Sequence, residues 1–216
     1  MLEFKFFWER FKYYMRILFS LIFTVVSVFT IVPISYAGAI TLQNAVEGEL
    51  YTESSQPELY CLAMNTYFEA KSEPIAGQYA TADVVLNRVN DARYPNTICE
   101  VVLQGPTRES WKTKQHKDLP EDQRKFNPVK HRCQFSWYCD GKADTVRDGD
   151  AWRKAQEIAY RIVFEKKYRG ITEGATHYHA TYVSPNWAPE LDLVGRIGTH
   201  IFYRWPYNFG KRSRLI

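Results

Sequence analysis

One carboxyl group, that of Glu69, occupies a position from which it could transfer a proton. The segment from Ser54 to Pro74 has the apolar spacing of a helix, and Glu69 falls on the same face as Leu62 and Thr66. Near the C-terminal end of a helix, the helix dipole and partial desolvation both raise the pKa of a carboxyl group. A carboxylic acid that stays protonated near neutral pH can protonate the leaving oxygen of a glycosidic bond. The alternative is a structural role, in which Glu69 turns out of the helix end into a salt bridge.

The sequence offers Glu69 no clear partner acid. Hydrolysis of a glycosidic bond normally requires two carboxyl groups about 5 to 9.5 Å apart. Glu73 lies one turn after Glu69, where it either raises the pKa of Glu69 as a like charge or serves as a ligand of the following loop. Asp140 belongs to a predicted Asp-Gly turn, in which aspartate is favoured for backbone reasons. The sequence therefore favours a mechanism that uses a single acid.

His177 and His179 are two residues apart in a predicted strand, so both side chains point to one face. There they could bind sugar hydroxyl and acetamide groups beside Gln134 and Ser136, with the ring of Trp137 stacked on a sugar. The alternative is that Trp137 belongs to the core and that backbone groups satisfy both histidines.

The same histidines raise a second possibility, a zinc-dependent peptidase or amidase that binds its metal with His177 and His179, with His200 as a candidate third ligand. No ligand motif with suitable spacing precedes the pair, since His116 and Asp122 lie in a polar stretch without regular periodicity. We therefore predict neither a metal nor another cofactor. A third possibility is a glycan-binding module without catalytic activity, which leaves the inward position of the glutamate unexplained.

Three predicted helices would position this acid. Ser55 and Glu58 have the spacing of a capping box at the start of the first helix. The segment from Gly77 to Val89 has a second apolar stripe and is expected to pack against the first helix. Thr97 and Glu100 are expected to open a short helix.

The downstream segments alternate between strand-like and helical patterns. Cys133 to Gly141 alternates with period two and reaches an Asp-Gly turn, which predicts a strand. Ala151 to Tyr168 is predicted to be an amphipathic helix that stops at Gly170, and the segments 175–180 and 191–203 are strand-like. Helices should therefore form the core, with short strands along one side.

The N-terminal segment has the pattern of an export signal. Residues 1–16 mix aromatic and basic side chains, residues 17–32 form an uncharged apolar run, and Ser35-Tyr36-Ala37 fits a cleavage site. The run is short for a membrane span of about 20 residues, and an uncleaved anchor is the alternative. The predicted divisions of the chain are a signal peptide or membrane anchor at 1–37, a linker at 38–56, a catalytic domain at 57–206 and a C-terminal tail at 207–216.

All four cysteines lie in the part of the chain that would be exported, where disulfides persist. Three pairings are formally possible, and the simplest joins Cys133 to Cys139 and Cys61 to Cys99. A zinc site explains these cysteines less well, because no Cys-x-x-Cys pair is present. We expect the protein in the periplasm or cell envelope, attached to the inner membrane only if the N-terminal segment is retained.

Residues 107–132 are polar and basic, with eight Lys or Arg against four Asp or Glu. They show little helical or strand periodicity, so we predict a surface excursion. Such a stretch is usually a solvated surface, and its functional alternative is attraction to an anionic polymer outside the cytoplasm. With a formal net charge of +4 and no recognisable binding motif, the chain is not expected to bind nucleic acid.

Several short motifs follow one another along the chain: Cys61-Leu-Ala, Tyr67-Phe-Glu-Ala70, Glu73-Pro74, Gly77-Gln78, Val84-Val-Leu-Asn-Arg-Val89, Tyr94-Pro-Asn-Thr97, Cys133-Gln-Phe-Ser-Trp137, Cys139-Asp-Gly141, Thr176-His-Tyr-His-Ala180 and Ile197-Gly198 to His200-Ile-Phe-Tyr-Arg204. In this order they resemble the SleB/CwlJ-type cell-wall hydrolase family over about residues 59 to 204. One departure is Ser72, where many relatives have glycine before the second glutamate.

The resemblance implies an α+β, mainly helical fold with a lysozyme-like core and a small β-subdomain. It implies peptidoglycan glycan strands as the substrate and Glu69 as the catalytic acid of a lytic transglycosylase. The bond cleaved would join N-acetylmuramic acid to N-acetylglucosamine, and hydrolysis by water through the same acid stays open. We expect a monomer. The predicted substrate-binding residues are Glu73, Gln134, Ser136, Trp137, His177, Tyr178 and His179.

Overall fold

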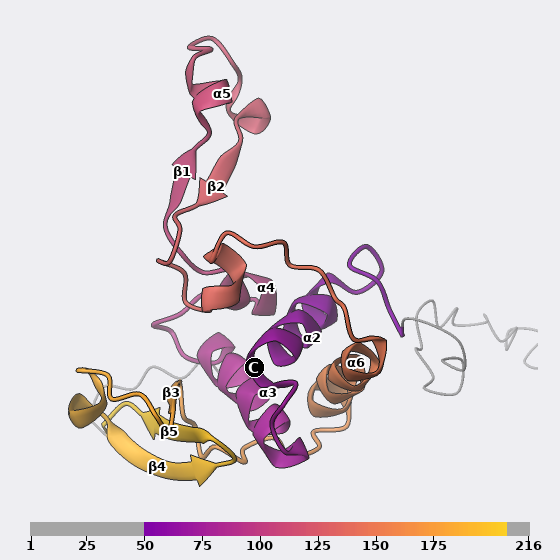
Figure 1. Ribbon diagram of the computed structural model, residues 1–216, viewed down its shortest axis with the longest axis vertical. Coiled ribbons are helices and arrows are strands. Elements are labelled where there is room, and N and C mark those ends of the chain that lie inside the picture. The colour runs from indigo at the N-terminus through magenta and orange to yellow at the C-terminus, as the bar shows by residue number, and fades with distance from the viewer. Residues whose placement is uncertain (1–49, 207–216) are drawn as a thin grey trace, which may run out of the picture. The chain divides into compact units, whose positions relative to one another are not determined.

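The computed structural model describes residues 50–206 (Figure 1). The α-helices are α2 (Pro57–Ala70), α3 (Ile75–Val89), α4 (Ile98–Val102), α5 (Trp111–Lys114) and α6 (Gly149–Phe164). The 3-10 helices are η2 (Glu121–Gln123), η3 (Ser136–Cys139) and η4 (Ala188–Glu190). The strands are β1 (Thr107–Glu109), β2 (Phe126–Pro128), β3 (His177–Ala180), β4 (Asp192–Ile197) and β5 (His200–Arg204). The mixed, mainly helical class predicted from the sequence is confirmed.

The predicted leader at 1–37 and tail at 207–216 lie outside the described residues. Within residues 50–206, no helix is long and apolar enough to cross a membrane. The end of the predicted linker is described, and it is packed: Tyr51 is buried and its hydroxyl donates to the carbonyl oxygen of Gln156 at 2.8 Å. The Gln156 amide in turn bonds the backbone of Tyr51 and Leu50. The packed domain therefore includes at least residue 50.

Helices α2, α3 and α6 pack against one another and form the main core (Figure 1). Their buried apolar side chains include Leu59, Leu62, Tyr67, Ala82, Val85, Trp152, Ile158 and Ile162. The hydroxyl of Tyr67 also accepts hydrogen bonds from the backbone N–H groups of Arg147 and Asp148, both at 3.1 Å, where α6 begins. This network fixes the C-terminal half of α2, which carries Glu69, against α6.

The predicted capping box at the start of α2 is wrong. The N-cap is Gln56, and Ser55 bonds Thr52 instead of the helix. The Glu58 carboxylate accepts hydrogen bonds from the N–H groups of Ile98 and Cys99, at 2.5 and 3.2 Å. These N–H groups lie in the first turn of α4, where backbone donors lack helical partners and the dipole favours an anion. Tertiary contact with α4 therefore replaces the local cap.

Both predicted disulfides are present. Cys61–Cys99 joins α2 to α4 with a Cα–Cα distance of 5.2 Å, and Cys133–Cys139 spans 6.0 Å. The second bond explains why the predicted strand over 133–141 is wrong. Six residues of a strand extend over about 20 Å, so a bond between residues six apart requires a compact turn. The chain forms the 3-10 helix η3 there instead.

Helix α6 ends at Phe164, before the predicted Tyr168, because the chain leaves the right-handed region soon after. Lys166 and Tyr168 both have φ of 55°, which a continuing helix cannot contain. The helix begins with Asp148 as its cap, whose carboxylate accepts from the N–H of Ala151 at 3.0 Å.

The C-terminal strands form an antiparallel sheet of order β3-β5-β4, which confirms the strand-like segments of the sequence. Phe202 on β5 is fully buried against Ala80 and Val84 of α3. Tyr178 of β3 is paired with Phe202 and shares that face. His177 and His179 alternate with Tyr178 and therefore lie on the opposite face of the sheet.

Residues 107–132 form an extension that we call the arm. Strands β1 and β2 pair antiparallel at its base, and α5 and η2 lie between them (Figure 1). The predicted surface excursion is confirmed, but it contains regular structure that the sequence pattern did not indicate. The strands are three residues long, too short to show periodicity.

Candidate active site

Glu69 lies in the last turn of α2, partly buried, and the Tyr178 hydroxyl donates a hydrogen bond to its Oε2 at 3.1 Å. Desolvation raises the pKa of Glu69, while the Tyr178 hydrogen bond and the charge of Arg88 lower it, and the net pKa is raised. Within residues 50–206 no ion pair to Glu69 is found, so the alternative of a helix-end salt bridge has no support there. The acid is thus held in a setting that favours its protonated form.

The hydroxyl of Tyr178 stays protonated and therefore acts as a hydrogen-bond donor. Burial, followed by the negative charge of Glu69, raises the pKa of Tyr178 well above its ordinary value, so the phenol keeps its proton. Its ring packs against His200 and Phe202, with centroids 4.9 and 5.6 Å away. These contacts hold the hydroxyl in place beside Glu69 without using it.

Arg88 supplies a buried positive charge to the same site. Its side chain is on α3 and the residue is only 2% exposed. The Nε group donates to the carbonyl oxygen of Thr176 at 2.7 Å, and the guanidinium lies over the rings of Tyr94 and Phe135. Desolvation lowers the pKa of Arg88, but an arginine stays charged at neutral pH.

Two of the predicted binding residues lie near η3: Gln134 is on the loop before it, and Ser136 is its first residue. When the Gln134 amide is assigned with its oxygen toward the guanidinium of Arg88, that oxygen accepts hydrogen bonds from Nη1 and Nη2 at 3.3 and 3.2 Å. Gln134 therefore lies against the arginine whose charge acts on Glu69. Ser136 is exposed at the start of η3.

Trp137 cannot stack on a sugar as predicted. Its ring is buried and lies against Phe68, with centroids 4.9 Å apart and the planes at 19°. The indole Nε1 donates to Oδ1 of Asn65 at 3.1 Å. Both the apolar ring and the polar group are used by the core, which is the alternative that the sequence left open.

Glu73 is a ligand of the loop between β4 and β5. Its carboxylate accepts hydrogen bonds from the N–H of Thr199, at 2.8 Å, and from the Thr199 hydroxyl. Desolvation raises the pKa of Glu73, but the two Thr199 bonds and the nearby charges of His200 and Arg196 outweigh it, and the net pKa is lowered. The pKa of Glu69 receives no contribution from Glu73. Of the two roles that the sequence left open for Glu73, the structure supports the loop ligand.

His177 and His179 lie on the sheet face opposite to Tyr178, and their predicted binding of sugar groups beside Gln134 and Ser136 stays a prediction. The rings of both histidines contact Trp187. The Nδ1–H group of His179 donates to the carbonyl oxygen of Ala180, so Nε2 of His179 accepts a hydrogen bond from the Tyr203 hydroxyl at 3.0 Å. Burial, and then the charges of Arg88 and Arg93, lower the pKa of His177 to about 4, so it is neutral at pH 7.

The zinc alternative has no geometric support. His200 faces the helices with Tyr178, whereas His177 and His179 face the other way, so the three rings do not converge. In the described part of the chain, no group of three or more His, Cys, Asp or Glu side chains has an arrangement suited to a metal ion.

Sequence reasoning missed the role of Arg88. Its signal was its place within the apolar face of the helix 75–89, close to Val84 and Val85, where a cation requires an explanation. Tyr178 was included among the binding residues, but only the strand alternation reveals that it turns toward Glu69. The site therefore joins side chains from α2, α3 and β3.

Residues 72–203 match the model of the Cell Wall Hydrolase family, and the chain belongs to this family. The match confirms the resemblance inferred from the motifs, and Glu69 lies three residues before its first position.

Curated relatives include the spore cortex-lytic enzyme of Bacillus subtilis, 37% identical over 62 residues that cover 29% of this chain and 20% of the relative. The enzyme of the same name from Halalkalibacterium halodurans is 25% identical over 150 residues, covering 68% of this chain and 35% of the relative. The chain thus spans about a fifth to a third of these relatives.

Among solved structures, the chain is similar to the catalytic domain of the Bacillus cereus SleB protein, with a TM-score of 0.45 at 24% identity, over 69% of this chain and 91% of the other. It is also similar to the catalytic domain of the germination-specific lytic transglycosylase SleB from Bacillus anthracis, with a TM-score of 0.46 at 23% identity, over 73% and 100%.

Proposed function

We propose that this protein degrades peptidoglycan by cleaving the bond between N-acetylmuramic acid and N-acetylglucosamine, with Glu69 as its single catalytic acid. The observation that carries the proposal is the setting of Glu69, a partly buried acid that accepts a hydrogen bond from Tyr178 and whose pKa is raised by desolvation. Family membership and the names of the cortex-lytic relatives support cell-wall glycan as the substrate. We expect a monomer that acts outside the cytoplasm, in the periplasm or cell envelope.

The proposed chemistry is lytic transglycosylation. Since Oε2 of Glu69 accepts the Tyr178 hydrogen bond, Oε1 carries the proton and gives it to the leaving glycosidic oxygen as the C1–O bond breaks. Glu69 is then an anion, and Tyr178 and Arg88 stabilise it. The anion removes the proton of the muramic 6-hydroxyl as that oxygen bonds C1, which closes the 1,6-anhydro ring and restores the acid.

The test is product analysis on purified sacculi. Wild type should release anhydromuropeptides, and Glu69→Gln should release none because the amide cannot supply a proton. Glu190→Gln, a change of the same kind at an exposed position, should behave as wild type. Reducing-end muropeptides lost with Glu69→Gln would indicate hydrolysis by water instead. If a chelator abolishes activity, the protein is a metal enzyme instead. If the protein binds sacculi but releases no products, it is a wall-binding module.

A further inference from the structure

The arm is an ordered part of the structure, so its exposed side chains have defined positions. The N–H of Ser110 donates to the carbonyl oxygen of Lys125 at 2.7 Å, which ties the two sides together beyond the strand pairs. Arg124 forms an ion pair with Glu109 at 2.8 Å and also donates to the carbonyl oxygen of Lys117 at 3.0 Å. Three chain segments of the arm, around residues 109–110, 117 and 124–125, are thus joined by hydrogen bonds.

Two large aromatic side chains on the arm are left in solvent. Trp111 is 66% exposed and Phe126 is 51% exposed. Helix α5 does not depend on Trp111, because Thr113 fastens it: the Thr113 hydroxyl donates to the carbonyl oxygen of Ser110 and accepts from the N–H of Lys125. A folded extension that holds a tryptophan in water without using it in packing is characteristic of a contact surface.

The arm also carries the excess positive charge of the chain. Its eight basic and four acidic residues leave the rest of the sequence balanced, with twenty of each sign. Among residues 50–206, Arg124 is the one basic side chain of the arm in an ion pair. The acids other than Glu109 lie together at positions 118–122. The exposed cations that flank the aromatic residues are Arg108, Lys112, Lys114 and Lys125.

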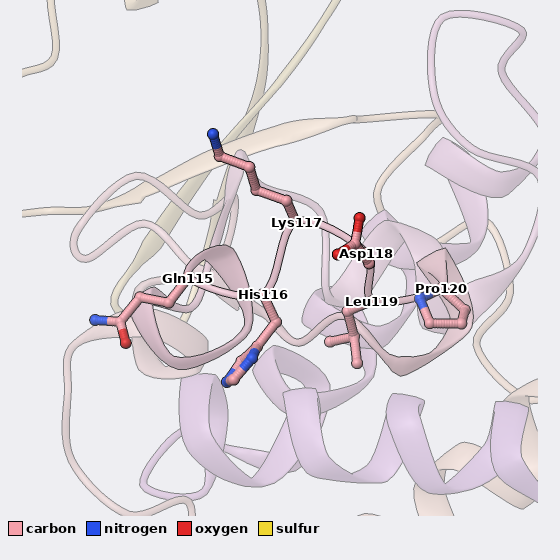
Figure 2. A pocket seen from close by; sticks show the side chains of 6 residues that line it. All are labelled: Gln115, His116, Lys117, Asp118, Leu119 and Pro120. Atoms are coloured by element: carbon pink, nitrogen blue, oxygen red, sulfur yellow. The ribbon is translucent and has the colours of Figure 1, made fainter.

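A shallow pocket of about 550 Å³ at the end of α5 is lined by residues 115–120. Figure 2 shows that the side chains of Gln115, Lys117 and Asp118 point away from one another rather than toward a common point. All six lining residues come from one continuous loop. The pocket brings no set of groups together on a ligand, so binding is assigned to the basic and aromatic surface of the arm.

We propose that the arm is a second binding site, distinct from the Glu69 site, for a glycan strand whose attached groups carry carboxylates. Trp111 and Phe126 offer apolar rings to sugar faces, and the flanking cations offer their charges to the carboxylates. The identity of the polymer as peptidoglycan rests on the proposed function, since its peptide stems supply these carboxylates. Binding at the arm raises the effective concentration of an insoluble strand around the catalytic site.

The test measures binding without cleavage, using the full chain with Glu69→Gln as the parent. Sacculi without teichoic acid are mixed with the parent and with a triple variant that adds Trp111→Ala, Lys112→Gln and Lys114→Gln. Binding is followed by cosedimentation at increasing sodium chloride. We expect the triple variant to bind at least about tenfold more weakly, since interface aromatics often account for this much, and to depend less on salt.

A matched control changes one exposed aromatic residue and two exposed lysines elsewhere. Phe164, which is 56% exposed, is replaced by alanine, and Lys154 and Lys166 by glutamine. This variant should bind sacculi as the parent does. Circular dichroism checks the fold, and Trp111→Ala alone provides a milder version of the change should the triple variant fail to fold.

Two further ligands separate the possible occupants. Glycan strands stripped of peptides by an amidase should bind more weakly than intact sacculi, and vesicles of phosphatidylglycerol and phosphatidylcholine should not compete with sacculi. Equal binding by the parent and the Trp111 variants overturns the proposal, as do equal binding to stripped strands and preferential binding to vesicles. None of these measurements depends on cleavage, so the proposal that the arm binds glycan can be refuted without affecting the proposal that Glu69 is catalytic, and the reverse.

Discussion

The hydrogen bond from Tyr178 to Glu69 predicts a displaced pH–activity profile when it is removed. Tyr178→Phe deletes the hydroxyl and keeps the ring that packs against Phe202 and His200. The hydroxyl favours ionised Glu69, so its loss raises the pKa of that carboxyl group further. Since the proposed reaction begins with protonated Glu69, activity falls at high pH as Glu69 ionises, and this alkaline limb should move to higher pH.

The size of the displacement follows from the strength of one hydrogen bond to a charged acceptor. Such a bond contributes about 1.5–3 kcal/mol, and about 1.4 kcal/mol corresponds to a tenfold change, so the limb should move by roughly one to two pH units. The maximal rate should fall by about tenfold or more, because the same bond stabilises Glu69 as the anion between the two proton transfers.

The assay is kcat/KM for anhydromuropeptide release from sacculi across pH. Tyr182→Phe is the matched control, since Tyr182 is 86% exposed and its hydroxyl should not influence Glu69. An alkaline limb that stays in place in Tyr178→Phe, or moves to lower pH, would refute the assignment of Tyr178 as the group that tunes the acid.

Three further predictions concern stability. Because the pKa of Glu69 is raised in the folded state, its ionisation destabilises the fold above the unfolded-state pKa, and Glu69→Gln should therefore raise the thermal midpoint at pH 7. This gain should fade as the pH falls through the folded-state pKa and be absent below the unfolded-state value of about 4. Gly198 has φ of 63° and a Cβ there would lie 2.0 Å from Oε2 of Glu73, so Gly198→Ala should cost about 1–3 kcal/mol in urea unfolding. Gly149→Ala, where a Cβ meets nothing within 4 Å, should cost far less. Removing the disulfide between α2 and α4, whose cysteines are 38 residues apart, should cost about 4 kcal/mol, against about 2 kcal/mol for the six-residue disulfide, in the same assay.

Features set by local pattern could be predicted from the sequence. Helical spacing placed Glu69 in α2 and the following stripe in α3, and both helices are present. Thr97 caps α4 through the N–H of Glu100, as its spacing indicated. Each of these helices and caps depends on residues within a few positions of one another, so tertiary contacts did not change them.

Features set by contacts between distant segments could not be predicted. Glu58 has the spacing of a local cap, yet it bonds α4, some 40 residues later. Glu73 bonds Thr199, more than 120 residues away. In each case, the sequence suggests a local role for the glutamate, but the folded chain brings it to a hydrogen-bond donor that is distant in the sequence.

A single acid that serves twice needs an environment that stabilises neither of its forms too strongly. Burial alone would keep Glu69 protonated and would make the release of its proton less favourable. Tyr178 and Arg88 oppose that effect, and both are themselves fixed: the phenol by its buried ring, the guanidinium by the carbonyl oxygen of Thr176. Thr176 and Tyr178 belong to one extended segment, so a single strand edge orients both groups. In the proposed mechanism, the sheet therefore influences how readily Glu69 on α2 gives up its proton and takes one back, although Glu69 is not part of it.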